Sequence, residues 1–295
     1  MTITTDTLEH AGARLVYDVR GPIPTEDGRP VLLMIGQPMD ASGFRALREQ
    51  LPERTVVTYD PRGLGRSTRD DGRTDHDPAV QAEDVHAIIA ALGVAPVDLF
   101  ASSGGAVTAL ALVQAHPHDV ATLVAHEPPL MQLLPDAEAA ARASAAGDAA
   151  YARGGFGAGM AEFNKLMMWE GEFTDANFAL PPADPAAFGL PTEDDGSRDD
   201  PLLSDASAAV TAWRPDVAAI AAAPTRVVIA VGEESRKVVT GRAAIATAET
   251  LGLEPVMFPS HHGGFLDGEF GWPGQPEAFA ARLREVLAPS EVASR

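Results

Sequence analysis

A serine between small residues and a histidine near a Gly-Gly pair are the residues best suited to covalent chemistry. Ser103 stands in the segment Ala-Ser-Ser-Gly-Gly, between an apolar run at 97–100 and a small-residue run at 104–115. The first run predicts a buried strand and the second a helix. A serine at the tip of such a sharp turn needs small residues two positions away on each side, and Ala101 and Gly105 meet that need. The helix N-terminus favours developing negative charge, so we predict that Ser103 is a nucleophile.

Ser102 is the alternative nucleophile in the same segment. Its flanking positions hold Phe100 and Gly104, and Phe100 is too large for the tip of such a turn. The segment departs from the usual Gly-x-Ser-x-Gly pattern only at Ala101, which is still small. Taken alone, the segment would also suit an ordinary tight turn rich in serine and glycine.

Candidate bases for this serine stand near the C-terminus. His261 and His262 lie in Phe-Pro-Ser-His-His-Gly-Gly-Phe, after a predicted strand at 254–258 and before a predicted helix at 276–287. An imidazole with an ordinary pKa of ~6.5 accepts a proton near neutral pH, as a general base must. Either histidine alone could also be structural. Histidines at a strand end, in helices or in turns receive no predicted role: His10, His76, His86, His116 and His118.

The segments that must position these residues alternate between strand and helix. Apolar runs predict eight strands, at residues 7–10, 14–19, 31–35, 55–59, 97–100, 120–125, 226–231 and 254–258. Helices are predicted at residues 42–51, 78–92, 104–115, 239–251 and 276–287. Such alternation is typical of a mostly parallel sheet with helices on both faces.

The alternation stops between about residues 130 and 222. Helices are predicted at 138–151, at 159–168 and at 206–222, the last interrupted at Pro215, with a loop rich in proline and aspartate at 181–205. We interpret this stretch as an insertion between two strands of one sheet, in other words a helical cap. The predicted division is a core of residues 1–129 and 223–295 and a cap of residues 130–222.

On these motifs, the chain resembles the α/β-hydrolase superfamily of serine hydrolases with a helical cap, over residues 14–287. Residues 59–67, Tyr-Asp-Pro-Arg-Gly-Leu-Gly-Arg-Ser, look like the loop after the fourth strand in that family, with Asp60 as a structural cap. The resemblance implies a mostly parallel eight-stranded sheet with helices on both faces. It also implies a catalytic base on the loop that holds His262, whose Gly-Gly-Phe sequence matches the family better than the position of His261 does.

The third member of a catalytic triad, the acid, is not at its usual place. Many relatives have it in a Gly-x-x-Asp turn, but residues 232–235 of this chain are Gly-Glu-Glu-Ser. Glu127 stands instead at the end of the predicted strand at 120–125, where two prolines follow it. A carboxylate at the end of a buried strand must be paired, either in a structural salt bridge or with His262, whose imidazolium it would stabilise.

A local likeness favours the second interpretation. The pair Ser-Ser-Gly-Gly and His-Glu-Pro resembles the fungal zearalenone lactonases, whose triad acid is a glutamate at this strand end. The resemblance implies that Glu127 is the acid, with Glu234 as the alternative and Glu233 after it. The chain order Ser…Glu…His is the one that this fold uses.

Acyl transfer also requires two N–H donors for the developing oxyanion, and removing one typically costs ~3 kcal/mol. The first predicted donor is the backbone N–H of Gly104, the residue after the nucleophile. In the family the second comes from the loop after the third strand, usually His-Gly. This chain has Ile-Gly-Gln-Pro-Met at residues 35–39, so position predicts the backbone N–H of Gln37.

Apolar side chains of the cap divide between a packed interior and a substrate pocket. We predict that Met39, with Met168, Trp169 and Phe173 of the cap, contacts an apolar acyl or alcohol group of the substrate. The acidic stretch at 193–200 does not have the spacing of a calcium loop, so it is interpreted as a solvated loop and no metal is predicted.

The composition limits the classes of partner. The 295 residues, 45% of them hydrophobic, suffice for one core with a smaller appended unit. A net charge of −20 argues against binding nucleic acid or an anionic membrane. Without cysteine, disulfides and thiolate chemistry are excluded. No apolar run approaches the ~20 residues of a membrane span, and the start lacks a signal-peptide pattern, so we expect a cytoplasmic protein. No cofactor is expected, and the oligomeric state is open.

Together these features predict an esterase or lactonase that forms an acyl-enzyme through Ser103, His262 and Glu127, with a small-molecule substrate. A perhydrolase or a carbon–carbon hydrolase uses the same triad and stays open. A dehalogenase or epoxide hydrolase would need an acidic nucleophile at position 103. An alternative from another functional class is a non-catalytic member of the superfamily that binds a small ligand. A purely structural protein would have no reason to combine Ser103, His262 and Glu127.

Overall fold

The apolar runs form the strands of one sheet. The computed structural model describes residues 2–271 and 273–288. Its strands are β1 (Ile3–His10), β2 (Ala13–Arg20), β3 (Leu32–Gln37), β4 (Val56–Asp60), β5 (Thr68–Arg69), β6 (Val97–Ser103), β7 (Val120–His126), β8 (Arg226–Gly232) and β9 (Val256–Phe258). Eight of them are the predicted strands. The two-residue β5 was missed because it is too short to produce an apolar pattern.

The strand order brings the predicted site to one edge of the sheet. The order is β1-β2-β4-β3-β6-β7-β8-β9, with β5 paired to β2. Strands β1 and β2 are antiparallel, whereas β4, β3, β6, β7, β8 and β9 are parallel neighbours. Gln37 pairs with Ser103 at the carboxyl ends of β3 and β6, and Glu127 directly follows β7 beside them. In open α/β sheets, ligands bind at this edge.

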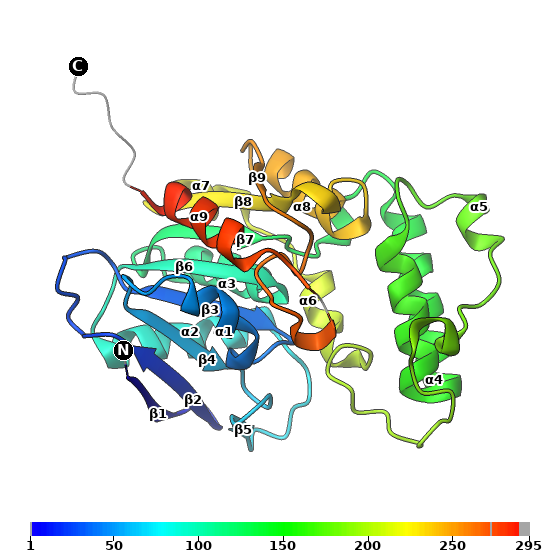
Figure 1. Cartoon of the computed structure of the whole chain (residues 1–295), viewed down its shortest axis with the longest axis horizontal. Helices are drawn as coiled ribbons and strands as arrows, with labels where there is room; N and C mark the ends of the chain where they lie inside the picture. Colours follow the sequence, from blue (N-terminus) through cyan, green and yellow to red (C-terminus); the bar gives the residue numbers. More distant parts are fainter. Residues whose placement is uncertain (1, 272, 289–295) are drawn as a thin grey trace.

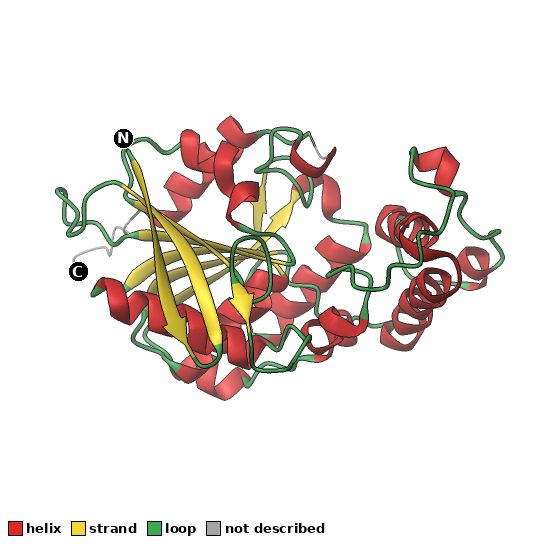
Figure 2. Cartoon of the chain, turned by 90° about the horizontal axis from the view of Figure 1, so that it is seen from below, coloured by secondary structure: helices red, strands yellow, loops and turns green. Residues whose placement is uncertain are grey.

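Helices cover both faces of the sheet (Figures 1 and 2). Helices α1 (Arg45–Glu49) and α9 (Pro276–Leu287) pack on one face, and α2 (Pro78–Leu92), α3 (Gly104–Ala115) and α8 (Val239–Thr250) on the other. Helix α2 shows clear end signals, because the Asp77 side chain accepts a hydrogen bond from the Ala79 N–H and Gly93 ends the helix at a φ of 63°. The predicted helix at 42–51 is a 3-10 turn, Ala41–Phe44, followed by the short α1.

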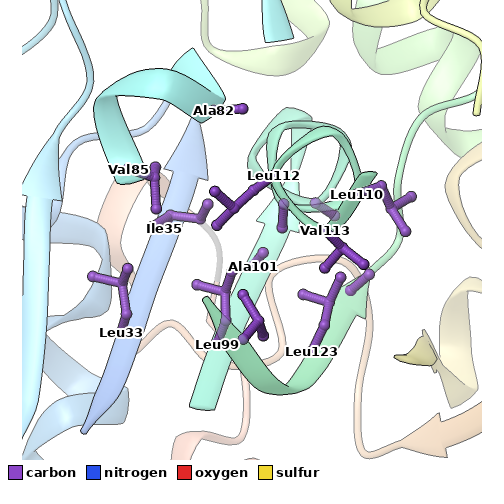
Figure 3. Close-up of a cluster of buried hydrophobic side chains, with 14 of the residues drawn as sticks. Leu33, Ile35, Ala82, Val85, Leu99, Ala101, Leu110, Leu112, Val113 and Leu123 are labelled. Carbon is purple, nitrogen blue, oxygen red and sulfur yellow. The ribbon is translucent and has the colours of Figure 1, made fainter. Parts of the chain in front are cut away.

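The core lies on both faces of the strands. Figure 3 shows one face, where side chains of β3, β6 and β7 meet those of α2 and α3: Leu33, Ile35, Leu99, Ala101 and Leu123 against Val85, Leu110, Leu112 and Val113. The intervening residues Met34, Phe100 and Val124 belong to the opposite face with Phe258 and Phe279. Since both faces are buried, the strands are continuous apolar runs in the sequence rather than alternating ones.

Between β7 and β8 the described residues form helices joined by loops, with no strand among them. It forms α4 (Ala137–Met168), α5 (Asp175–Phe178), α6 (Ala208–Ala212) and α7 (Val217–Ala222), and Figure 1 shows α4 and α5 to one side of the sheet. Val210 of α6 and Ile220 of α7 join the core cluster that α3 covers. The boundaries at 130 and 222 stay a prediction, since this last part packs on the core.

Helix α4 consists of two helical stretches, as predicted. Two helices were expected, at 138–151 and 159–168, and the non-helical backbone of Gly155 (φ 71°, ψ −162°) separates the two stretches within residues 137–168. The glycines here are used for close approach: a Cβ at Gly157 would lie 1.8 Å from the carbonyl oxygen of Pro191. Gly155 therefore ends the first stretch, and Gly157 admits the neighbouring loop. Further 3-10 turns are Met131–Leu133, Pro185–Phe188, Asp205–Ser207, Glu233–Ser235 and Glu269–Gly271.

Candidate active site

Ser103 lies at the strained tip of the turn between β6 and α3. Its backbone has φ 57° and ψ −129°, a conformation that non-glycine residues rarely adopt, and its side chain does not cap the helix. The small neighbours are required by contact with β3. A Cβ at Gly105 would lie 2.7 Å from the Cα of Gly36, and one at Gly104 would lie 2.9 Å from the carbonyl oxygen of Gln37. The turn holds the half-buried Ser103 at the edge of the sheet.

Ser102 faces the opposite way. It is buried, and its hydroxyl lies 3.2 Å from Nδ1 of His126, which is also fully buried. The His126 ring is surrounded by Phe100, Phe258 and Phe279. Burial lowers the pKa of His126 to about 4, so this imidazole is neutral at neutral pH. Sequence reasoning did not consider His126, although a histidine ending a buried strand was a visible signal.

Glu127 and His262 form a hydrogen-bonded pair. Oε2 of Glu127 lies 2.7 Å from Nδ1 of His262, and Oε1 accepts a hydrogen bond of 2.8 Å from the Gly232 N–H. The carboxyl is completely buried, whereas the imidazole is about one-fifth exposed. Burial alone would raise the pKa of Glu127, but the hydrogen bond and charge of His262 lower it to about 2. The carboxylate is therefore ionised. Because it contacts Nδ1 of His262, the other ring nitrogen, Nε2, is left for a different partner.

The other candidates for these roles lie apart from that pair. Glu233 and Glu234 are exposed in the turn after β8, and no hydrogen bond joins either carboxylate to His262 in the part of the chain described. His261 has its own contacts: Nδ1 accepts from the Gly263 N–H at 3.0 Å, and Nε2 lies 3.2 Å from the carbonyl oxygen of Pro273.

A cavity of about 150 Å³ brings Ser103 and His262 together with Gln37 and Gly104. Its remaining lining is mainly apolar. Most of it comes from the segment between β7 and β8, including Pro129, Met131, Phe163, Leu166, Met167, Leu203 and Val210, and the rest is Pro38 after β3 with Val239 and Thr240 of α8. The arrangement places a serine hydroxyl and an imidazole against a small apolar space. The cavity also holds two carboxylates on the α4 side, those of Asp148 and Glu162.

The four predicted substrate contacts fall in two places. Met39 and Met168 line a wider groove of about 980 Å³ that also reaches His262. Phe173 is buried in a cluster between α4 and α8, where Trp169 packs beside it. Neither Trp169 nor Phe173 is among the residues that line the cavity or the groove. An apolar side chain that packs in the interior and one that lines a pocket look alike in a sequence. The sequence pattern therefore did not distinguish the two packed residues from the two that line the groove.

Asp60 fixes the loop that follows Gln37. Its buried carboxylate accepts hydrogen bonds from the Ala41 N–H at 3.0 Å and from the N–H and Nε of Arg66 at 2.8 and 2.7 Å. Ser67 in turn donates to the Asp60 carbonyl at 2.7 Å. These bonds connect the loop after β3 to the loop after β4. Asp60 therefore has the structural role that was expected for it.

The Gln37 side chain belongs to a buried polar chain that sequence reasoning missed. Thr108 donates to Gln81 at 2.9 Å, and Nε2 of Gln81 donates to Oε1 of Gln37 at 3.4 Å. These three residues come from α3, α2 and β3. These contacts orient the Gln37 side chain beside Gly104 at the end of β3. No local pattern in the sequence indicates a contact between elements so far apart in the chain.

The comparison with family models decides the family. A model described as alpha/beta hydrolase fold matches residues 29–208, more than half of the chain. The chain belongs to the α/β-hydrolase fold family. This α/β hydrolase has no helix within residues 2–271 and 273–288 that combines the length and the apolar character needed to cross a membrane.

Relatives agree with this assignment. The "uncharacterized hydrolase YraK" of Bacillus subtilis (strain 168) is 38% identical over 135 residues, 45% of this hydrolase and 48% of that protein. A proline iminopeptidase of Xylella fastidiosa (strain 9a5c) is 31% identical over 112 residues, 38% of this chain and 35% of that protein. The matches thus span less than half the length of these relatives. A thermophilic esterase of Thermogutta terrifontis shares the fold, with 22% identity, a TM-score of 0.62, and 97% and 98% of the two chains covered.

Proposed function

We propose that this α/β hydrolase cleaves a carboxylic ester or lactone through an acyl-enzyme on Ser103. The observation that carries the proposal is the 2.7 Å hydrogen bond between the buried Glu127 and His262, an imidazole that shares a cavity with Ser103. A buried carboxylate bonded to a partly exposed histidine beside a serine on a strained turn is the arrangement of a nucleophile, a base and an orienting acid.

In the proposed reaction, Oγ of Ser103 attacks the ester carbonyl carbon while Nε2 of His262 takes the hydroxyl proton. The negative charge moves to the carbonyl oxygen, where the backbone N–H groups of Gly104 and Gln37 donate to it. The tetrahedral intermediate then expels the alkoxide, which leaves as the alcohol with the proton from His262. Water repeats the steps on the acyl-enzyme and releases the acid and free Ser103.

The electrostatics support the role of Glu127. Its pKa of about 2 keeps the carboxylate ionised across the pH range in which an imidazole works as a base. Its bond to Nδ1 fixes the tautomer with Nε2 free to accept a proton, and its charge stabilises the imidazolium that forms during attack. The Gly232 N–H holds the second oxygen, so the carboxylate is fixed in orientation.

The cavity favours a substrate with an apolar acyl or alcohol part. Zearalenone, a lactone, is a specific candidate that follows from the local sequence likeness. A perhydrolase or a carbon–carbon hydrolase would use the same three residues, and the iminopeptidase relative adds cleavage of an N-terminal proline amide as a further activity to assay. Position 103 is a serine, which disfavours epoxide hydrolysis by an acidic nucleophile.

The first experiment is hydrolysis of p-nitrophenyl esters of increasing acyl length by the wild type, Ser103→Ala and Ser102→Ala. We expect turnover by the wild type and by Ser102→Ala, and a loss of several orders of magnitude in Ser103→Ala. Zearalenone, with ring opening followed by mass spectrometry, and proline p-nitroanilide complete the substrate panel.

Wild-type protein that turns over none of these substrates would be tested with a fluorophosphonate. Labelling at Ser103 without turnover would favour a narrow hydrolase or a ligand-binding member of the fold. Equal activity of Ser103→Ala and wild type would refute the acyl-enzyme proposal.

A further inference from the structure

Two histidines without a predicted role meet at the end of the molecule opposite the active site. His116 follows the last turn of α3, whose first residue is next to Ser103, so the two sites lie about 18 Å apart along that 12-residue helix. His86 comes from the middle of α2, and Asp119 precedes β7. Their rings are stacked face to face, with centroids 3.7 Å apart and an angle of 6° between the planes.

Carboxylates contact both rings. Nδ1 of His86 lies 2.7 Å from Oδ2 of Asp119, and Nε2 of His116 lies 2.9 Å from Oε1 of Glu83. One ring nitrogen from each histidine and one oxygen of Asp119 all lie within 4.8 Å of one another. No other group of three or more histidine, aspartate or glutamate side chains in the described residues meets that condition.

We propose that His86, His116 and Asp119 bind a divalent transition-metal ion of the zinc class. Two imidazoles and one carboxylate form the mixed nitrogen and oxygen set that Zn²⁺ prefers, whereas Mg²⁺ and Ca²⁺ prefer oxygen alone. Ligands at 2.0–2.1 Å around a tetrahedral ion are about 3.3 Å apart, so the widest pair of atoms must close by up to about 1.5 Å. Because the lone pair of an imidazole nitrogen lies in the ring plane, the two stacked rings must also tilt toward the ion. The imidazoles are 38% and 23% exposed, which leaves room for that movement.

Glu83 completes the arrangement as an orienting residue. A histidine that binds a metal through one nitrogen usually donates its other N–H to a carboxylate, which fixes the tautomer. When Nε2 of His116 donates its N–H to Glu83, Nδ1 of that ring is left for the ion. The net charge of −20 further favours a cation at this surface.

A metal ion here would join α2 to the turn between α3 and β7. The three ligands come from two parts of the chain, His86 from α2 and His116 with Asp119 from this turn, and Glu83 lies one helical turn before His86. Because the site is at the far end of α3, the ion would stabilise the core and take no part in chemistry at Ser103.

The test is a calorimetric titration of tag-free full-length protein with Zn²⁺ alone, beside a thermal unfolding scan with and without the ion. Variants are His86→Gln, His116→Gln and Asp119→Asn, with His118→Gln as the matched control, an exposed histidine of the same turn. We expect saturable binding and a raised Tm in the wild type and in His118→Gln. Each ligand variant should bind at least ~10-fold more weakly, since even outer partners of a metal site contribute 10–100-fold.

Cobalt provides a readout that a structural effect of the substitutions would not produce. Co²⁺ bound by the wild type should give visible absorption bands of a tetrahedral site, and these bands should be lost in His116→Gln although its circular dichroism matches the wild type. Zn²⁺ affinity that is the same in wild type and in all three ligand variants would overturn the proposal, as would the absence of saturable binding by the folded wild type.

Discussion

Glu127 is the residue on which the site depends most. It directly follows the buried strand β7 with a left-handed φ of 47°, and its backbone N–H donates to the Ala230 carbonyl at 3.0 Å. Both carboxylate oxygens have partners, one on the neighbouring strand end and one on His262. Both the backbone and the side chain of Glu127 are thus held in place. A substitution by glutamine, which keeps the shape but not the charge, separates the effect of the charge on catalysis from the effect of the shape on packing.

Glu127→Gln should lower kcat by about 10³–10⁴-fold with little change in KM, because an amide does not stabilise the imidazolium and can hold the wrong tautomer. Steady-state kinetics on the best p-nitrophenyl ester measure this. Glu234→Gln, in the exposed turn after β8, should leave kcat unchanged. The opposite pattern would move the role of the acid to Glu234.

At the residue scale, sequence patterns identify groups but not contacts. The turn around Ser103 and the His262 loop have local signatures, and Glu127 stands out because an acidic residue at the end of an apolar strand is costly. Its bond to His262 joins residues 135 positions apart, and only the order of the strands creates it. Gln81 and Thr108 have no local signature, since their contacts depend on which elements lie beside them.

At the scale of elements, Arg242 of α8 anchors both ends of α4. Its guanidinium pairs with Asp136 before α4 and donates to the Gly171 carbonyl after α4 at 2.6 Å. Asp136 also accepts from the Phe173 N–H at 2.7 Å. Both side chains of the ion pair are largely buried, so they connect the sheet's covering helix with the segment that roofs the cavity.

Arg242→Met should lower the free energy of unfolding by about 3 kcal/mol, because it leaves a buried carboxylate without its cation while the side chain stem still packs. Urea unfolding measures this, and limited proteolysis should cut residues 130–222 faster in the variant. Lys237→Met removes an exposed ion pair to Glu170 at the same junction and should change stability by less than ~1 kcal/mol. Equal effects of the two substitutions would contradict the anchoring role.

Helix α4 shows why element boundaries are harder to predict than element types. A run of glycines normally weakens a helix, so the sequence favours an ending near residue 155. In the structure the non-helical backbone of Gly155 separates two helical stretches, as this preference favours. The composition thus predicts the break, whereas its position depends on close approaches that the sequence does not show, such as that of Pro191 to Gly157. The doubly buried strands were predictable because their signal is a local apolar run, repeated for every strand.

At the scale of the molecule, two buried histidines make stability depend on pH. Burial lowers the pKa of both His126 and His76 to about 4. The unfolded chain protonates its histidines near ~6.5, so between these values it binds more protons than the folded protein. Stability is therefore complete above about pH 6.5 and falls as the pH decreases toward about 4. Glu127, whose pKa is lowered to about 2, adds a further loss below about pH 4.5.

His126→Gln should reduce this acid sensitivity, because glutamine can still bond with Ser102 but does not titrate. The difference in unfolding free energy between about pH 7 and about pH 5 should be roughly 2 kcal/mol smaller in the variant than in the wild type. Urea unfolding at the two pH values measures it. His126→Gln combined with His76→Gln should flatten the profile further. Parallel profiles for all proteins would show that these two imidazoles do not govern the acid limb.

The insertion point of the helical segment has a consequence for how the chain can be divided. Ser103 and Glu127 precede that segment, His262 follows it, and β7 and β8 on either side are paired neighbours. A cut in the exposed acidic loop at residues 193–199 would therefore yield one fragment with the nucleophile and the acid and another with the base. Neither fragment holds all three of Ser103, Glu127 and His262. Turnover that returns when the two fragments are mixed would therefore report that they have reassembled, which is the principle of a split-enzyme reporter.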